Sequence, residues 1–134
     1  AIGDANVNAT TQSAHTYPIT DDERSITYAA STVTEVGAND GSFTSTLGFT
    51  LSGDTFASVG VQALTTKYTV ANIPSGLTVV VTTTSPTAGN ISFTGNAAAH
   101  ANINDVTNGT VIFTNAAFTG GSAATVVGYN KTNI

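Results

Sequence analysis

Apolar and polar residues alternate along much of this 134-residue chain, most clearly in residues 42–51. In that stretch Phe43, Leu47, Phe49 and Leu51 fall on one face and threonines fall on the other. A period of two predicts a half-buried β-strand. Similar runs, rich in β-branched and aromatic residues, occupy residues 25–36, 56–61, 67–73, 77–84, 90–94, 110–114 and 123–129.

Turn-forming sequences separate these runs at short intervals: NDG, SGD, IPSG, SPTAGN and FTGGS. Short strands at this spacing indicate an all-β, antiparallel sandwich of about seven to nine strands rather than an α/β fold. The first of these turns, at residues 39–41, suits the positive φ of a tight turn and comes directly before the alternating run.

Two segments break the alternation. Residues 96–106, NAAAHANINDV, are rich in Ala, which predicts a helical turn in a long crossover between the two sheets, as in Greek-key sandwiches. Residues 1–23 have little to bury and are expected to form an extended N-terminal arm. Within the arm Ala5, Val7 and Ala9 share one side, a short strand-like pattern. The chain thus divides into an arm, residues 1–23, and one sandwich domain, residues 24–134.

Composition narrows the classes of partner. Only 8% of residues are charged and the net charge is −5. Because Arg24, Lys67 and Lys131 are the only Lys and Arg, nucleic acids and anionic membranes are poor partners. No run approaches the roughly 20 apolar residues of a membrane span. The absence of Cys and Met, with many hydroxyl and amide side chains, suits an extracellular or cell-surface protein.

Three longer motifs carry a family resemblance. They are NDGSFTSTLGFTLSGDTF at residues 39–56, YTVANIPSGLTVVVTTTS at residues 68–85 and FTGNAAAHANINDVTNGTVIFTNAAFTGG at residues 93–121. Over about residues 31–129 the chain resembles an immunoglobulin-like repeat that occurs in tandem in large secreted and cell-surface proteins of bacteria. The resemblance implies an adhesion-like or matrix-like module with no catalytic residues to carry over. Here the chain holds one copy, with the arm in place of a preceding repeat.

Acidic residues are the candidate metal ligands. If each strand simply reverses the last, the loops sort so that Asp21, Asp22, Asp54 and Asp105 gather at one end, and Asp40 lies at the other. Calcium takes six to eight oxygen ligands, and such a cluster offers carboxylates for it. The spacing matches no calcium motif, however, so solvated loop acids are the alternative interpretation. No other cofactor is expected.

The sequence gives only weak evidence for catalytic residues, a zinc site or glycosylation. His15 and His100 are the only imidazoles, and neither has a second His or a Cys at zinc-ligand spacing. We expect His100 to cap or hydrogen-bond the crossover. No Gly-x-Ser-x-Gly pattern occurs, and the chain is expected not to be an enzyme. N-glycosylation sequons begin at Asn8, Asn90, Asn108 and Asn130.

The uncharged, threonine-rich surface is the strongest functional signal. It lacks the edge Lys and Glu residues that normally block strand-to-strand association. The arm could therefore donate a strand to another copy of the chain, and a head-to-tail contact of this kind builds a filament. The alternatives for the arm are a disordered leader and a segment that packs on its own domain. The alternative function is an adhesin module that recognises a glycan or a host surface, with or without calcium. Aromatic residues clustered at one end of the sandwich would favour that alternative.

Overall fold

The computed structural model describes residues 23–134. Several predicted features lie outside these residues. They are the strand-like piece Ala5, Val7 and Ala9, the sequon at Asn8, His15, and the acids Asp21 and Asp22. Within the described residues no helix is long and apolar enough to cross a membrane.

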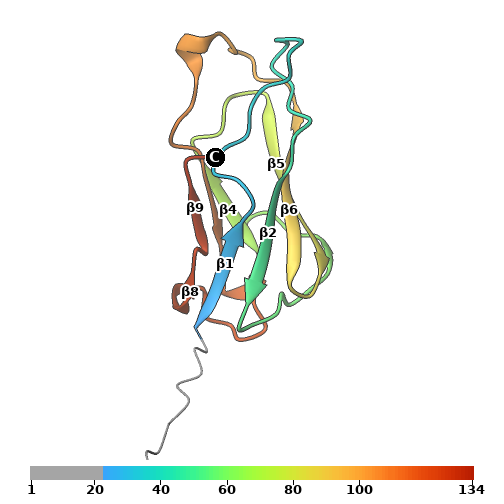
Figure 1. Cartoon of the computed structure of the whole chain (residues 1–134), viewed down its shortest axis with the longest axis vertical. Coiled ribbons are helices and arrows are strands. Elements are labelled where there is room, and N and C mark those ends of the chain that lie inside the picture. Colours follow the sequence, from blue (N-terminus) through green and yellow to red (C-terminus); the bar gives the residue numbers. More distant parts are fainter. Residues whose placement is uncertain (1–22) are drawn as a thin grey trace, which may run out of the picture.

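Nine strands in residues 23–134 form two sheets (Figure 1). The large sheet has the order β3 (Gly60–Val61), β5 (Leu77–Ser85), β6 (Ala88–Gly95), β2 (Leu47–Ser52), β1 (Arg24–Tyr28) and β8 (Val126–Val127). The small sheet has the order β4 (Tyr68–Ala71), β7 (Thr110–Phe113) and β9 (Asn130–Thr132). The predicted all-β sandwich is confirmed.

The core lies between the two sheets and is rich in aromatic rings. The alternation in β2 turns Leu47, Phe49 and Leu51 inward, and all three are buried. The ring of Phe49 meets that of Phe113 on β7 edge-on, with centroids 5.5 Å apart. Phe56 stacks on Phe118 at 5.8 Å and closes the core at one end. Edge and offset ring pairs of this type add to the free energy gained from burial.

Every run predicted to be a strand contains one, but several strands are shorter than predicted. The run at residues 25–36 ends as a strand at Tyr28, and the next begins only at Leu47. Between them the predicted turn is present, with Asn39 at φ 51° and Gly41 at φ 80°. The N–H of Asn39 donates to the carbonyl of Val36 at 3.0 Å. Phe43, expected in the core, is only half-buried, because it precedes the strand.

Three 3-10 turns complete the described elements: η1 (Asn102–Asn104), η2 (Asn115–Ala117) and η3 (Ala123–Thr125). The first lies in the crossover between β6 and β7, so the predicted helical turn there is confirmed as a single short turn. The other two lie between β7 and β8. Only η3 falls within a run predicted to be a strand, residues 123–129.

A single run of chain near the C-terminal side serves both sheets. β8 pairs with β1 in parallel, the one parallel pairing between named strands of the described residues, with Arg24 opposite Val126. After Gly128, at φ 79°, the chain continues as β9 in the small sheet. Tyr28 donates its hydroxyl hydrogen to the carbonyl of Gly128 at 2.9 Å, which ties β1 to this bend. β9 itself was not predicted, because Asn-Lys-Thr carries no apolar alternation.

Candidate functional site

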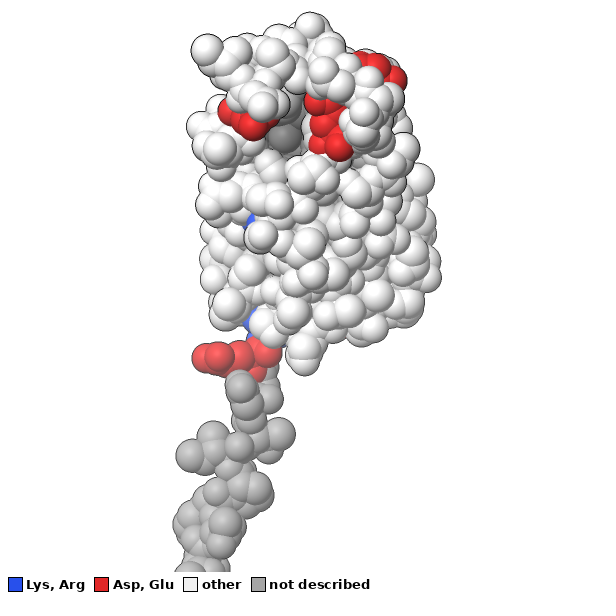
Figure 2. Space-filling view, turned by 45° about the horizontal axis from the view of Figure 1, so that its top comes forward, with Lys and Arg blue, Asp and Glu red and all other residues white. Residues whose placement is uncertain are grey.

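A cavity of about 610 Å³ lies at the end of the sandwich where the crossover runs. Figure 2 shows acidic side chains on both sides of the hollow at this end. Its lining combines apolar side chains with a few polar ones and comes from four separate parts of the chain: residues 32–35 and 43, residues 72–77, the crossover with Phe93, and the segment ending at Ile134. We call it the crossover cavity.

The turn at residues 39–41 positions one wall of this cavity. The N–H of Ala97 donates to the carbonyl of Gly41 at 2.8 Å, and the Asn96 side-chain amide donates to the carbonyl of Asp40 at 2.9 Å. A Cβ on Gly41 would lie 2.5 Å from the carbonyl oxygen of Ala97, so only glycine allows this approach. The predicted turn therefore docks the start of the crossover on the sandwich.

Asp40 takes part in this turn rather than in the cavity lining. Hydrogen bonds from the hydroxyl and the N–H of Ser42 hold the pKa of Asp40 below its ordinary value. An aspartate that accepts bonds from the backbone two residues on is a usual turn former. Its role in forming the turn is therefore enough to explain Asp40, without a bound metal ion.

Glu35 and His100 face each other across the wall of the cavity. The Nδ1 atom of His100 lies 3.5 Å from Oε1 of Glu35, within ion-pair distance if the imidazole is protonated. The same Nδ1 atom is buried and has no hydrogen-bond partner. Glu35 Oε1 also accepts a short hydrogen bond from the N–H of Gly41. We expected His100 to cap or hydrogen-bond the crossover. Its Nδ1 atom makes no such bond and lies beside the Glu35 carboxylate instead.

No Lys or Arg side chain lies beside the acids of the cavity. Glu35 and Asp105 both line it, and none of the lining residues is Lys or Arg. The chain's three Lys and Arg residues bond elsewhere: Arg24 to Asp54 at 2.8 Å, Lys67 to the carbonyl of Ala116, and Lys131 to the carbonyl of Ser31 at 2.6 Å. The negative charge of the cavity is therefore not balanced by any Lys or Arg of the chain.

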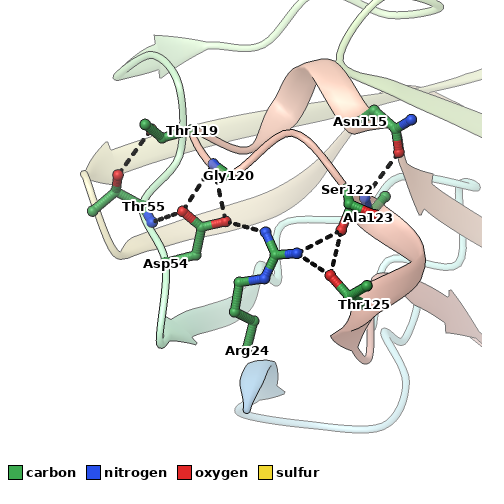
Figure 3. A network of polar contacts seen from close by, with 9 residues as sticks. All are labelled: Arg24, Asp54, Thr55, Asn115, Thr119, Gly120, Ser122, Ala123 and Thr125. Carbon is green, nitrogen blue, oxygen red and sulfur yellow. Dashed lines mark hydrogen bonds and ion pairs between the residues drawn. The ribbon is translucent and has the colours of Figure 1, made fainter. Parts of the chain in front are cut away.

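The opposite end of the sandwich holds a closed polar network around Asp54 (Figure 3). The Asp54 carboxylate accepts a hydrogen bond from Arg24 at 2.8 Å, one from the N–H of Thr55 at 2.7 Å and one from the N–H of Gly120 at 3.2 Å. The other arm of the guanidinium donates to the carbonyl of Ser122 at 3.3 Å and to the hydroxyl of Thr125. Burial opposes ionisation, but these bonds outweigh it and hold the pKa of Asp54 below its ordinary value.

The prediction that Asp54 and Asp105 gather at one end is therefore wrong. Asp54 follows β2 at the end where β1 begins, whereas Asp105 lies in the crossover at the other end (Figure 1). No group of three or more His, Cys, Asp or Glu side chains in residues 23–134 is placed to hold a metal ion. The other two proposed ligands, Asp21 and Asp22, lie outside the described residues.

The error has one physical source, the length of β3. The run at residues 56–61 becomes a strand of only two residues, which does not carry the chain across the sandwich. Residues on both sides of it stay at the same end: Thr55 bonds Thr119 at 2.9 Å, and the Thr114 hydroxyl donates to the carbonyl of Thr66 at 2.6 Å. If residues 56–61 crossed the sandwich, every later loop, including the crossover, would lie at the opposite end from the one it occupies.

The short β3 also leaves one edge of the large sheet unfinished. It pairs with only Thr82 and Thr83 of β5, which is nine residues long. Large apolar side chains on this segment are exposed to solvent: Val59 by 57%, Val61 by 74% and Leu64 by 43%. Residues 55–66 contain no charged side chain. We call this segment the β3 edge.

The sequon asparagines in the described residues differ in exposure. Asn108 and Asn130 are exposed, whereas Asn90 on β6 is half-buried. Their glycosylation stays a prediction.

Sequence reasoning missed the crossover cavity. Its acids and His100 stand in the segments that lack alternation, which was the available signal, but the cavity forms only when four distant segments meet. Searches of protein-family models, of curated proteins and of solved structures found no match to this chain. Its functional interpretation consequently rests on its own geometry.

Proposed function

We propose that this protein is a non-enzymatic, extracellular structural subunit with an immunoglobulin-like Greek-key topology. On this proposal, copies of the chain assemble into a cell-surface filament or matrix by strand donation from the N-terminal arm. The strand order supports the topology: β1, β2, β6 and β5 occupy the places of strands A, B, E and D, and β4, β7 and β9 those of C, F and G.

The observation that carries the assembly proposal is the β3 edge. Gln62 donates its N–H to the carbonyl of Val81 on β5 at 2.8 Å. Because successive residues of a strand direct their backbone groups to opposite edges, the N–H and carbonyl of Val61 point away from β5. Soluble proteins protect such edges with Lys, Pro or covering loops. This edge instead presents uncharged, exposed valines, which are suitable contacts for an added strand.

The N-terminal arm has a pattern of apolar residues that matches this acceptor. Ala5, Val7 and Ala9 offer small apolar side chains at period two, which fit beside bulky Val59 and Val61 on a neighbouring copy. Each copy would then give one strand and receive one, so the contact does not close and a filament grows.

Electron microscopy of three proteins tests this proposal. We expect the intact chain to form filaments and a variant lacking residues 1–20 to remain monomeric. A charge on the acceptor edge, Val61→Lys, should also prevent filament growth, whereas Thr50→Lys, on an exposed position of the central strand β2, should not. A synthetic peptide of residues 1–20 should bind the deletion variant but not its Val61→Lys form.

Two results would sink strand donation. One is persistence of filaments after deletion of residues 1–20. The other is a strictly monomeric intact protein in sedimentation velocity runs across a wide concentration range.

The second candidate function is a ligand-binding adhesin module, which the crossover cavity favours. Its lining includes the paired rings of Phe43 and Phe93, with centroids 5.5 Å apart, so aromatic residues do gather at one end. Apolar pockets of a few hundred cubic ångströms with a few convergent polar groups are common ligand sites. Binding to a glycan array by the monomeric deletion variant, with and without a calcium chelator, would test this function and its calcium dependence.

A further inference from the structure

We infer that the crossover cavity binds an organic cation, an ammonium group carried on an apolar stem. The inference rests on the second candidate function, ligand binding in this cavity, and is independent of strand donation. Four observations carry it: the charge of the lining, the placement of Glu35, the aromatic pair, and the size of the cavity.

The charge of the lining selects a cation. Glu35 and Asp105 bring two carboxylates to the cavity, and no Lys or Arg lines it. Two carboxylates near a partly enclosed, apolar space repel an anion and attract a cation more strongly than they would in open water. Arg24, Lys67 and Lys131 are bonded to other groups, and among the lining residues only His100, when protonated, can pair with Glu35. While His100 is neutral, a bound cation supplies the compensating charge.

Glu35 is placed to anchor that charge. Its Oε1 atom accepts the Gly41 N–H and lies beside Nδ1 of His100, so the carboxylate is held at a fixed position. Both of these contacts fall on Oε1, which leaves Oε2 to accept a hydrogen bond from a ligand. Hydrogen bonds between an ammonium group and a carboxylate are short and strong.

The rest of the lining selects an apolar stem. The rings of Phe43 and Phe93 lie at an interplanar angle of 39°, and Ile73, Leu77 and Val106 also line the space. An aromatic face attracts a nearby cation, and the aliphatic side chains favour a hydrocarbon segment. A volume of about 610 Å³ suits a small molecule rather than a bare ion.

A metal ion fits the same residues less well. Calcium requires six or more oxygens and zinc requires about four ligands at tetrahedral spacing. The described residues contain no group of three or more metal-ligating side chains. The carboxylate of Glu35, with apolar side chains around the same space, instead matches one ammonium group and its stem.

Isothermal titration calorimetry on the full-length chain tests the inference with n-hexylammonium as the probe. We expect saturable binding of hexylammonium, and none of hexanol or hexanoate, which have the same stem with no charge or the opposite charge. Glu35→Gln should weaken binding about tenfold or more, because it removes the charge and keeps the shape. Phe93→Leu should weaken it several-fold through loss of the aromatic face.

The matched control is Glu23→Gln, which removes one negative charge at the opposite end of the sandwich and should leave the affinity unchanged. Far-ultraviolet circular dichroism of each variant shows whether it has folded. Shifts in NMR amide signals should centre on residues 35, 93 and 100.

Several results would overturn the inference. They are equal binding of hexanol and hexylammonium, no saturable binding of the amine, an affinity that Glu35→Gln leaves unchanged, or calcium binding that Glu35→Gln abolishes. If the amine fails but a neutral glycan shifts the same amide signals, ligand binding in the cavity stands and the cation inference alone is wrong.

Discussion

The carboxylates at the two ends of the sandwich have different surroundings. At the end where β1 begins, Asp54 meets a guanidinium and two backbone N–H groups, so its charge is balanced and its oxygens are bonded. At the crossover end, Glu35 and Asp105 border a cavity in which no Lys or Arg lies. The first arrangement stabilises the fold, because every polar group it buries has a partner. The second leaves two carboxylates without a Lys or Arg partner, which is the basis of the proposed cation site.

The backbone shows the same contrast. At the crossover end Gly41 allows two segments to touch through their main chains, and the wall of the cavity depends on that contact. At the Asp54 end Gly121 also has a positive φ, of 74°, but nothing lies within 4 Å of the position a Cβ would take. One glycine is required by packing and the other only by its backbone angle.

Paired alanine substitutions at these glycines should give the largest effect. We expect Gly41→Ala to lower the free energy of unfolding by about 3 kcal/mol, because it adds a steric clash with Ala97 to the cost of a positive φ. Gly121→Ala should cost only about 1 kcal/mol, the backbone term alone. Urea denaturation followed by circular dichroism measures both. Equal losses would mean that the docking of the crossover contributes no stability.

Removal of one carboxylate from each end should give a smaller but clear difference. Asp54→Ala strips Arg24 and the Gly120 N–H of their acceptor, and we expect a loss of about 2 kcal/mol in the free energy of unfolding. Asp105→Ala, at an exposed position, should change it by less than about 0.5 kcal/mol. The same urea titrations compare the two variants. A loss of similar size at both ends would remove the distinction drawn between them.

The smallest effect should come from acid. Since the pKa of Asp54 is lower in the folded chain than its ordinary value, the folded state holds fewer protons, and its stabilising contribution is complete above about pH 5. That contribution is lost as the pH falls below about 4, through the folded pKa. The melting temperature of the wild type should therefore fall more steeply between pH 5 and pH 3 than that of Asp54→Asn. Parallel curves for the two proteins would contradict this assignment.

The sequence was sufficient for those parts of the fold that local pattern determines. Alternation located every strand with apolar residues on its inner face, and the positive φ values of Asn39 and Gly41 follow from the turn at residues 39–41. β9 escaped notice because its three residues are held by pairing with β7 rather than by burial of their side chains.

The position of the candidate sites needed information that local pattern does not hold. Whether residues 56–61 cross the sandwich depends on tertiary contacts such as that of Thr55 with Thr119. The answer determines which acidic residues lie at the same end. The cavity likewise requires the meeting of residues 32–35, 72–77 and the crossover. Glu35, Asp105 and His100 were visible in the sequence, but their proximity was not.

The parallel pairing of β1 with β8 has a mechanical consequence. If tension enters the chain before β1 and leaves it after β9, the two neighbouring strands are pulled in opposite directions along their length. The hydrogen bonds between them, and the Arg24 contacts to Ser122 and Thr125 beside them, then carry the force together instead of breaking one after another. We therefore expect a domain connected in this way to resist stretching along the line that joins its two ends.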